Sequence, residues 1–459
     1  MLAIFILGGN MVNIKNLSKT DKEISYWLKK EAVRQKEGLE MIPSENYVSD
    51  AVLEAMGSIL TNKYSEGYPK KRYYGGNEFI DEIEIIAQER AKKLFGVEYV
   101  NVQPYSGSPA NLAVYLATCN PGDTVMGLDL THGGHLTHGW KVSATGIFYN
   151  SIQYHVESKS GKIDFDELKR LVKEHKPKLI WVGATAYVYE FPFKELSEIA
   201  NISGSFLAAD IAHVAGLVIA GAHLSPAKYA HIITTTTHKT LRGPRGAMIM
   251  VTKKGLSKDS ELGEKIDRAI FPGLQGGPHD HTTAAIAVAL KEASKANFKK
   301  YGKQIVKNAK VLATELIKRG FKLVGNGTEN HMNLIDLVPV FGPGGGFFAQ
   351  YVLDTAGITV NKNTIPGEPM SPFYPSGIRI GTPALTTRGM KEKEMKKIAV
   401  WYEKIINVAK VYSLPKEKEK RKEYLDNFKK EIHKNKKLLE IKHEINKFAS
   451  KYPIFAWDR

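Results

Sequence analysis

Residues 206–246 read FLAADIAHVAGLVIAGAHLSPAKYAHIITTTTHKTLRGPRG, and this segment indicates the fold class. Two short apolar or threonine-rich runs in it, Phe206–Ala209 and Ile232–Thr237, have the length and composition of buried strands. Asp210 follows the first run, and Lys239 lies 29 residues further on, about one strand–crossover–strand unit. Ligands of open α/β sheets bind beyond the carboxyl ends of the strands. We therefore expect the acid and the amine to face one site.

The same alternation extends through the middle third of the chain. An amphipathic helix is predicted over 164–175 and another through 80–94. Further buried strands are predicted at Thr124–Met126, Leu179–Val182 and Ala247–Val251. Alternating strands and helices indicate an α/β domain with a largely parallel sheet. From about residue 284 the chain is mainly helical, with strand candidates at 322–324, 333–337 and 358–360, which indicates a second, smaller α+β domain.

These patterns divide the chain into an N-terminal arm (1–60), a large domain (61–290) and a C-terminal small domain (291–459). The arm is predicted to be helical from Asn13 to Leu39. Near the C-terminus, Lys416–Lys447 holds twelve basic and seven acidic residues, a net charge of +5. Opposite charges alternate there, and apolar residues recur at roughly helical spacing at Leu425, Phe428, Ile432, Leu439 and Ile445. This pattern predicts a solvated amphipathic helix rather than a nucleic-acid-binding arm.

Composition limits the classes of protein that the chain can belong to. Of its 459 residues 43% are apolar and 25% are charged, which is close to globular averages and excludes wholesale disorder. The single cysteine, Cys119, excludes an intrachain disulfide and fits a reducing, cytoplasmic compartment. The net charge of +17 favours anionic partners in general. We expect no nucleic acid among them.

The N-terminus gives no sign of a membrane or export segment. The longest apolar run, Met1–Leu7, is far shorter than the roughly 20 residues of a spanning helix. It lacks a basic leader and a cleavage site, so we predict neither a membrane helix nor a signal peptide. Met11 is an alternative start.

Lys239 has the surroundings of a nucleophilic amine. Such an amine needs a lowered pKa, which burial and nearby cations provide. His238, Arg242 and Arg245 are the candidate neighbours, and they belong to a run rich in glycine, proline and arginine that is typical of an anion-binding turn. A lysine paired with a carboxylate that faces a pyridinium nitrogen is the requirement of pyridoxal phosphate chemistry, and Asp210 meets it.

A second feature fits a phosphate group. Gly107 and Ser108 precede a predicted helix, and backbone N–H groups at a helix start suit an anion. Taken alone, each of these features has a simpler explanation. Asp210 could be a helix cap or half of a buried ion pair, Lys239 a surface lysine, and the Gly-Ser turn an ordinary cap.

Several longer motifs occur along the chain and share one resemblance. They are residues 43–46, 61–69, 71–76, 132–139, 210–217, 234–246 and 377–383. Together they resemble the serine hydroxymethyltransferase family, pyridoxal-phosphate enzymes of the aspartate aminotransferase fold. The resemblance covers most of the chain from about residue 20 to 405. It implies a pyridoxal-phosphate-binding large domain with a mostly parallel seven-stranded sheet, a smaller α+β C-terminal domain and a homodimer.

The resemblance also implies how the coenzyme is held. Lys239 forms the internal aldimine, and Asp210 pairs with the pyridine nitrogen. His135 stacks on the ring, while His213 and Thr185 lie near its phenolic oxygen.

The phosphate and the substrates have their own implied sets of residues. Gly107, Ser108 and His238 hold the phosphate, with the partner's Tyr64 and the partner's Gly277. The amino acid is bound by Arg379, Ser44, Arg245 and the partner's Tyr74. The partner's Glu66 handles the substrate hydroxyl and protons near the folate, and Leu130, Gly134 and Asn363 line the folate site.

The implied reaction moves the hydroxymethyl group of serine reversibly to tetrahydrofolate, giving glycine and 5,10-methylenetetrahydrofolate. A pterin-independent aldolase for threonine-type β-hydroxy amino acids, or an α-methylserine hydroxymethyltransferase, is the alternative enzyme. Retention of Glu66 and of the set Leu130, Gly134 and Asn363 favours the folate reaction, although a modified pterin could replace tetrahydrofolate. A basic nucleic-acid-binding protein on a lapsed enzyme scaffold would have lost Lys239 or Asp210, and both are present.

Two further expectations concern metal and crowding. His132, His135 and His138 recur every three residues, but the intervening glycines argue against a rigid ligand face, so we predict no metal site. Some positions depart from the family pattern, and we expect them to crowd the cofactor and substrate region. They are Tyr105, Pro109, Thr185, Val188–Glu190 and Leu274.

Overall fold

Strands between residues 99 and 251 pair into one sheet of seven, in the order β4-β10-β9-β8-β7-β5-β6. They are β4 (Tyr99–Asn101), β5 (Thr124–Leu128), β6 (Asn150–Tyr154), β7 (Leu179–Val182), β8 (Phe206–Asp210), β9 (Ile232–Thr236) and β10 (Ala247–Val251). β5 to β9 run parallel, and β10 is antiparallel to both of its neighbours. The computed structural model, which describes residues 14–454, therefore confirms the predicted mostly parallel seven-stranded sheet.

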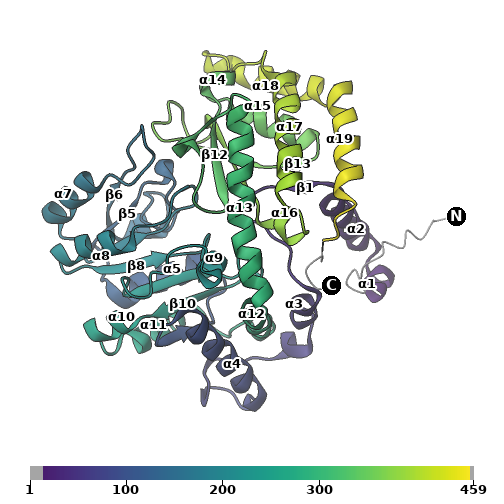
Figure 1. The fold of residues 1–459 in the computed structure, drawn as a ribbon. Helices are drawn as coiled ribbons and strands as arrows, with labels where there is room; N and C mark the ends of the chain where they lie inside the picture. The colour runs from purple at the N-terminus through teal and green to yellow at the C-terminus, as the bar shows by residue number, and fades with distance from the viewer. Residues whose placement is uncertain (1–13, 455–459) are drawn as a thin grey trace.

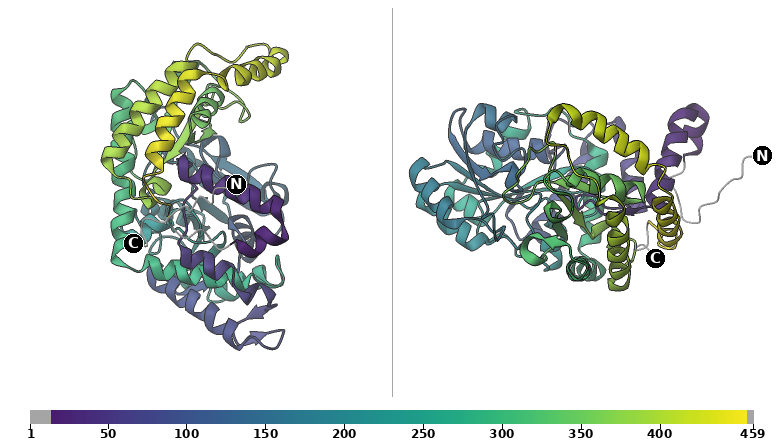
Figure 2. Two further views of the ribbon diagram at one scale, coloured as in Figure 1. Left: turned by 90° about the vertical axis from the view of Figure 1, so that its right-hand side faces the viewer. Right: turned by 90° about the horizontal axis from the view of Figure 1, so that it is seen from above.

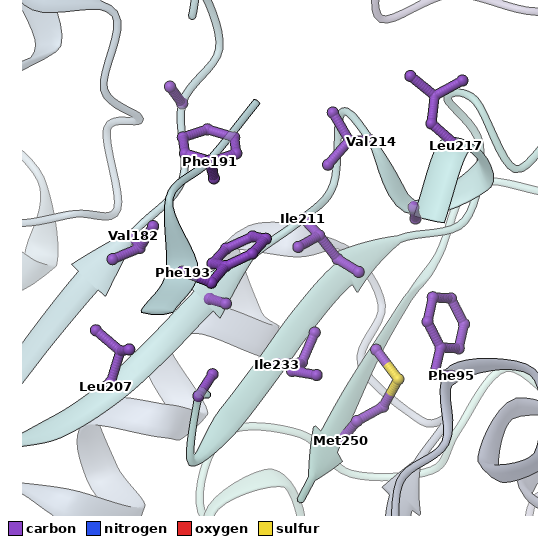
Figure 3. Packing of buried hydrophobic residues seen from close by; sticks show 14 of the residues in the cluster. Phe95, Val182, Phe191, Phe193, Leu207, Ile211, Val214, Leu217, Ile233 and Met250 are labelled. Atoms are coloured by element: carbon purple, nitrogen blue, oxygen red, sulfur yellow. The ribbon is translucent and has the colours of Figure 1, made fainter. Parts of the chain in front are cut away.

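Both faces of this sheet are covered by helices, which explains why its central strands are almost entirely buried. Ile232 of β9 belongs to the core under α5 (Gly107–Thr118) and α11 (Leu262–Ile270). The next residue, Ile233, belongs to the core on the opposite face. Figure 3 shows part of that second core, where Leu207, Ile233 and Met250 extend from neighbouring strands.

The remaining helices of this half of the chain complete the two layers. Those that contribute to the second core are α4 (Glu78–Phe95), α7 (Phe165–His175), α8 (Phe193–Ile202), α9 (Ala215–Ala220), α12 (Asp280–Ala293) and α13 (Ala296–Lys318). Shorter elements lie in the connections: β2 (Gly67–Tyr68), β3 (Lys71–Arg72), η1 (Ile59–Asn62), η2 (Leu130–His132), α6 (Ala144–Phe148) and α10 (Lys253–Lys258). The helices predicted around 80–94 and 164–175 are thereby confirmed as α4 and α7.

The C-terminal part has its own four-stranded antiparallel sheet, in the order β11-β12-β15-β14. Its elements are β11 (Lys322–Leu323), η3 (Val324–Asn326), β12 (Met332–Asp336), α14 (Val338–Phe341), α15 (Gly346–Thr355), β13 (Ile358–Thr359), β14 (Asn361–Asn363), β15 (Gly377–Gly381), α16 (Pro383–Thr387), α17 (Glu392–Ala409), α18 (Lys418–Ile432) and α19 (Lys436–Ala449). The helices α17 to α19 lie at the end of the molecule opposite α4, α10 and α11 (Figures 1 and 2).

Two segments join the halves. α13 contributes Phe298 to the core of the large sheet and Leu316 to the core of the small one, and it runs between them in Figure 1. The N-terminal arm starts with α1 (Lys15–Thr20) and α2 (Lys22–Glu37), and α3 (Asp50–Met56) follows further along the chain. Leu39 was predicted to be helical, but α2 ends before Gly38 and Leu39 lies in β1 (Leu39–Glu40), which pairs with β13. The domain boundaries near 60 and 290 stay predictions.

The basic C-terminal segment differs from its prediction, because it forms two helices and not one. α18 ends at Ile432, and the side chain of Asn435 accepts a hydrogen bond from Leu438 N and so begins α19. Because α19 begins anew after Asn435, its apolar positions do not continue the helical repeat of α18. As a result Leu438 is buried, whereas Leu439 is 45% exposed.

Some predictions fall on residues that the structure leaves undescribed. The apolar run Met1–Leu7, the alternative start Met11 and Asn13 lie outside the described residues. Within residues 14–454, no helix is long and apolar enough to cross a membrane.

Candidate active site

A cavity of about 610 Å³ opens at the carboxyl edge of the large sheet and extends to the small one. Its walls are Ser44, Glu45, Ser106, Gly107, Ser108, Leu130, His135, Leu136, Thr185, His213, Thr236, His238, Lys239, Arg245, Asn363 and Arg379. Twelve of these are predicted site residues. Glu45, Leu136 and Thr236 belong to the motifs but had no predicted role, and Ser106 adjoins the predicted Gly107.

Lys239 follows β9 and reaches the cavity from beneath. Burial lowers the pKa of its amine to about 8, and the nearby cations Arg379 and Arg245 act in the same direction. The Asp210 carboxylate partly opposes this shift. About a tenth of Lys239 is therefore an uncharged amine at pH 7, far more than for an ordinary lysine, and this is the form that acts as a nucleophile.

Asp210 ends β8 and is held by a network of hydrogen bonds. Its carboxylate accepts hydrogen bonds from Asn111 Nδ2 at 2.8 Å, from Ala212 N at 3.0 Å and from His138 Nε2 at 3.2 Å. Within the described part of the chain His138 Nδ1 has no partner, so we assign the ring proton to Nε2. Burial alone would raise the pKa of Asp210, but the hydrogen bonds from His138 and Asn111 hold it below the usual range. Asp210 therefore stays ionised and can hold a proton on a ring nitrogen that faces it.

His135 lies above this network. Thr137 donates to its Nδ1 from the backbone N at 3.2 Å, and the Thr137 hydroxyl lies 2.7 Å from the same atom. Burial and the neighbouring His138 lower the pKa of His135 to about 4. The ring is therefore neutral and fixed in orientation, as stacking on a flat heterocycle requires.

The structure also brings possible metal ligands together. Atoms of His135, His138 and Asp210 lie within 4.8 Å of one another, a group that the spacing of the histidines did not reveal because Asp210 is distant in sequence. His138 and Asp210 already hydrogen-bond to each other, and His135 is engaged by Thr137. We therefore interpret the group as support for a ring nitrogen.

The start of α5 has the properties of a phosphate cradle. Ser106 makes no side-chain cap there, which leaves the first backbone N–H groups available to a ligand. A Cβ on Gly107 would lie 2.9 Å from Thr236 Cγ2, so only glycine allows this close approach. Two buried atoms in the wall, Thr236 Oγ1 and His238 Nδ1, have no partner among the described residues. Unpaired buried polar atoms and a glycine-lined turn fit a phosphate group well.

The far wall carries Arg379, which lies in β15. Its Nε donates to Asn361 Oδ1 at 3.2 Å, and its Nη1 donates to the carbonyl of Thr185. Burial lowers the pKa of Arg379 to about 10, so the side chain is still charged at neutral pH. It forms no ion pair with any residue in 14–454. A buried cation without a counter-ion is suited to bind the carboxylate of a ligand.

His213 lines the cavity together with Lys239. Its Nδ1 is 3.2 Å from Nε2 of His331, a contact across 118 residues that no local motif predicts. Burial and then the Lys239 charge hold the pKa of His213 well below its usual range. Thr185, nearby on the wall, donates from its hydroxyl to Gly134 O at 3.1 Å.

Six predicted site residues do not line this cavity: Asp210 and Gly134, and four others that form a group of their own. Tyr64 Oη donates to Glu66 Oε1 at 3.2 Å, and the Tyr64 ring packs edge-on against Tyr74 at 5.2 Å. A Cβ on Gly277 would lie 3.1 Å from the Tyr64 ring. Tyr64 is 54% exposed. The chain therefore does not bring this group into its own cavity.

The expected crowding of the site is wrong for most of the unusual positions. Thr185 does line the cavity. Tyr105, Pro109 and Leu274 line a separate cavity of about 440 Å³ beside it. The segment Val188–Glu190 instead contacts the small domain. The positions are adjacent in sequence to site residues, but their side chains point elsewhere.

The lowered pKa of Lys239 gives a measurable pH dependence. At pH 8 about half of its amines should be uncharged, against well under 1% for a lysine of ordinary pKa near 10.5. In coenzyme-free protein, competitive labelling of Lys239 with acetic anhydride should thus rise with pH to half its maximum near pH 8. Mass spectrometry of the labelled peptide measures this. Asp210→Asn should move the midpoint lower, because it removes the charge that raises the pKa. A midpoint above pH 10 would contradict the assignment.

Comparison with known proteins gives further evidence on the family of this chain. The family model described as serine hydroxymethyltransferase matches residues 17–402. A serine hydroxymethyltransferase of Acidothermus cellulolyticus is 57% identical over 389 residues, which cover 85% of this chain and 89% of that protein. A serine hydroxymethyltransferase of Sorangium cellulosum is 54% identical over 392 residues, covering 85% and 90%.

Proposed function

Because the chain belongs to the serine hydroxymethyltransferase family, we propose that the cavity above Lys239 is its active site. The chain transfers the hydroxymethyl group of serine reversibly to tetrahydrofolate, giving glycine and 5,10-methylenetetrahydrofolate. Pyridoxal phosphate is its coenzyme. The family assignment favours this reaction over the pterin-independent aldolase and the α-methylserine enzyme. One observation supports this location of the site. The buried amine of Lys239, with its lowered pKa, and the buried carboxylate of Asp210 lie at a cavity that also contains Arg379, which forms no ion pair with a described residue.

When bound, pyridoxal phosphate supplies an electron sink for the charge left on the α-carbon as the hydroxymethyl group departs. Lys239 provides the amine that attaches it. Asp210 keeps a proton on the ring nitrogen, and the neutral ring of His135 covers the ring face. Gly107 and His238 hold the phosphate through N–H groups, since both adjoin the unpartnered polar wall of the cavity.

The substrate occupies the side of the cavity nearer the small domain. Arg379 binds the carboxylate of serine with its planar fork, and Ser44 lies on the same cavity wall. Leu130 and Asn363, also on the wall, are placed to contact the pterin of the folate. Gly134 adjoins His135 of the cavity wall, and only glycine fits there, because a Cβ would collide with the carbonyl of Leu128. The same contacts would accept tetrahydrofolate or a modified pterin.

The remaining roles require a second subunit. Tyr64, Glu66, Tyr74 and Gly277 form one group that does not line the cavity of their own chain, and Tyr64 and Tyr74 are exposed. We propose that a homodimer with two-fold symmetry delivers this group to the partner's cavity. There Glu66 exchanges a proton with the substrate hydroxyl. We also propose a cytoplasmic location, which the buried free thiol of Cys119 supports.

Hybrid dimers test the shared site. Lys239→Ala and Glu66→Gln homodimers should each be nearly inactive. A hybrid of the two, purified through different tags, should recover about half of the wild-type activity, because one of its two sites has both groups. Serine-dependent formation of methylenetetrahydrofolate measures this. An inactive hybrid that is properly dimeric would refute the shared site and leave the cavity itself unaffected.

A further inference from the structure

Tyr105 connects the segment before the phosphate-binding turn to the loop that carries Gly277. Its hydroxyl donates to Gly277 O at 2.6 Å, and its backbone N–H donates to Gln275 Oε1 at 3.0 Å. Gln275 Nε2 donates in turn to Gln103 O at 2.9 Å. Three hydrogen bonds therefore fasten the two segments to each other, although they are about 170 residues apart in sequence.

The orientation of the Tyr105 ring is fixed as well. It stacks on His279 with a centroid distance of 4.1 Å and an interplanar angle of 6°. His279 immediately precedes α12, so the stack rests on a well-packed helix. A ring held on its face and at its hydroxyl has little rotamer freedom left, and it can therefore fix the carbonyl to which it donates.

The connection continues from Gly277 to the group that we place in the partner's site. The Tyr64 ring lies against Gly277, and Tyr64 Oη donates to Glu66. Between these residues Ser65 Oγ donates to Asp280 Oδ1 at 2.7 Å, and Ser65 is fully buried. Residues 64–66 and 277–280 thus form one unit, and Tyr105 is one of its supports.

We propose that Tyr105 is a positioning residue that acts across the dimer interface. It holds Gly277 and Tyr64 of its own chain in the position from which they reach the coenzyme phosphate of the partner. This inference rests on the proposed sharing of sites between subunits. Tyr105 is a position where this chain departs from the family pattern. The inference gives it a role in the partner's site and not in the Gly107 turn of its own chain, two residues away.

A hybrid dimer separates the two sites. One chain carries Lys239→Ala and the other keeps Lys239, so only the second chain gives the visible absorbance of lysine-attached coenzyme. Tyr105→Phe is placed on one chain or the other, and the coenzyme dissociation constant of the Lys239 site is measured by titration. The matched control is Tyr154→Phe, which also removes a hydroxyl that donates to a backbone carbonyl, that of Trp181 at 3.0 Å in the core of the sheet.

On the Lys239→Ala chain, Tyr105→Phe should raise this constant roughly 2- to 10-fold, the effect of losing one neutral hydrogen bond. On the chain that keeps Lys239, Tyr105→Phe should change the dissociation constant less than twofold. The control Tyr154→Phe should also change it less than twofold, on either chain. An effect confined to the Lys239 chain, or no effect on either, would overturn the inference. The Lys239→Ala and Glu66→Gln hybrid is the separate check, since its activity tells whether the sites are shared at all.

Discussion

Lys239→Ala should lower kcat/KM for serine at least about a thousandfold, because the variant lacks the nucleophile that attaches the coenzyme. The amine is buried, its pKa is lowered to about 8, and it lies beside the ionised Asp210. Neither His238 nor Arg245 can replace it, since neither is a primary amine. Steady-state kinetics with serine and tetrahydrofolate measure the loss. Lys239→Arg should be similarly inactive, because a guanidinium stays charged.

The matched control is a lysine of the same domain that burial also affects. Burial lowers the pKa of Lys254, which donates to Tyr229 O at 3.0 Å and does not line the cavity. Lys254→Ala should therefore keep kcat/KM within about threefold. The free energy of unfolding of Lys239→Ala should stay near that of the parent or exceed it, since burying a charged group destabilises a protein. Activity retained in Lys239→Ala, or lost equally in Lys254→Ala, would remove Lys239 from its assigned role.

The sequence predicts the central sheet well for a physical reason. β7, β8, β9 and β10 are buried on both faces, so they appear as unbroken runs such as Leu179–Val182. The edge strands β4 and β6 were missed. β4 has three residues, and β6 alternates polar and apolar residues with one buried position among its five. β15 was quoted only as a motif, because its two glycines conceal a strand that is fully buried.

The candidate site also has a part that the sequence predicts and a part that it does not. Residues in short motifs, such as Lys239 and Gly107, were predicted because the chemistry of each motif is local. Contacts between distant segments were not. Asn111 and His138 hold Asp210 from 99 and 72 residues away, and His331 reaches His213 across 118. Only the fold determines which polar groups meet in this manner, so a single sequence gives the candidates and not their partners.

Arg379→Met should have opposite effects on activity and on stability. Arg379 is 8% exposed, and its guanidinium forms no ion pair with a described residue. It is therefore a buried charge that serine would neutralise. Losing that charge pair should cost about 3–5 kcal/mol in the bound state, a fall in kcat/KM of roughly 10²- to 10⁴-fold that is expressed mainly in KM for serine. The same change should raise the free energy of unfolding of the ligand-free protein, because removing a buried charge without a counter-ion outweighs the loss of two hydrogen bonds, to Asn361 Oδ1 and the Thr185 carbonyl.

Arg388 supplies the control, since it is also buried, at 1% exposure, but satisfied by the protein itself. Its guanidinium donates to the carbonyls of Gly38 at 2.7 Å, Ala449 at 2.6 Å and Tyr452 at 2.9 Å. Arg388→Met leaves these carbonyls unpaired, so urea unfolding should show a loss of about 2–4 kcal/mol. The two substitutions are thus expected to change the free energy of unfolding in opposite directions, although both arginines are buried. If Arg379→Met lost as much stability as Arg388→Met and kept its KM for serine, Arg379 would be a structural residue and the substrate carboxylate would bind elsewhere.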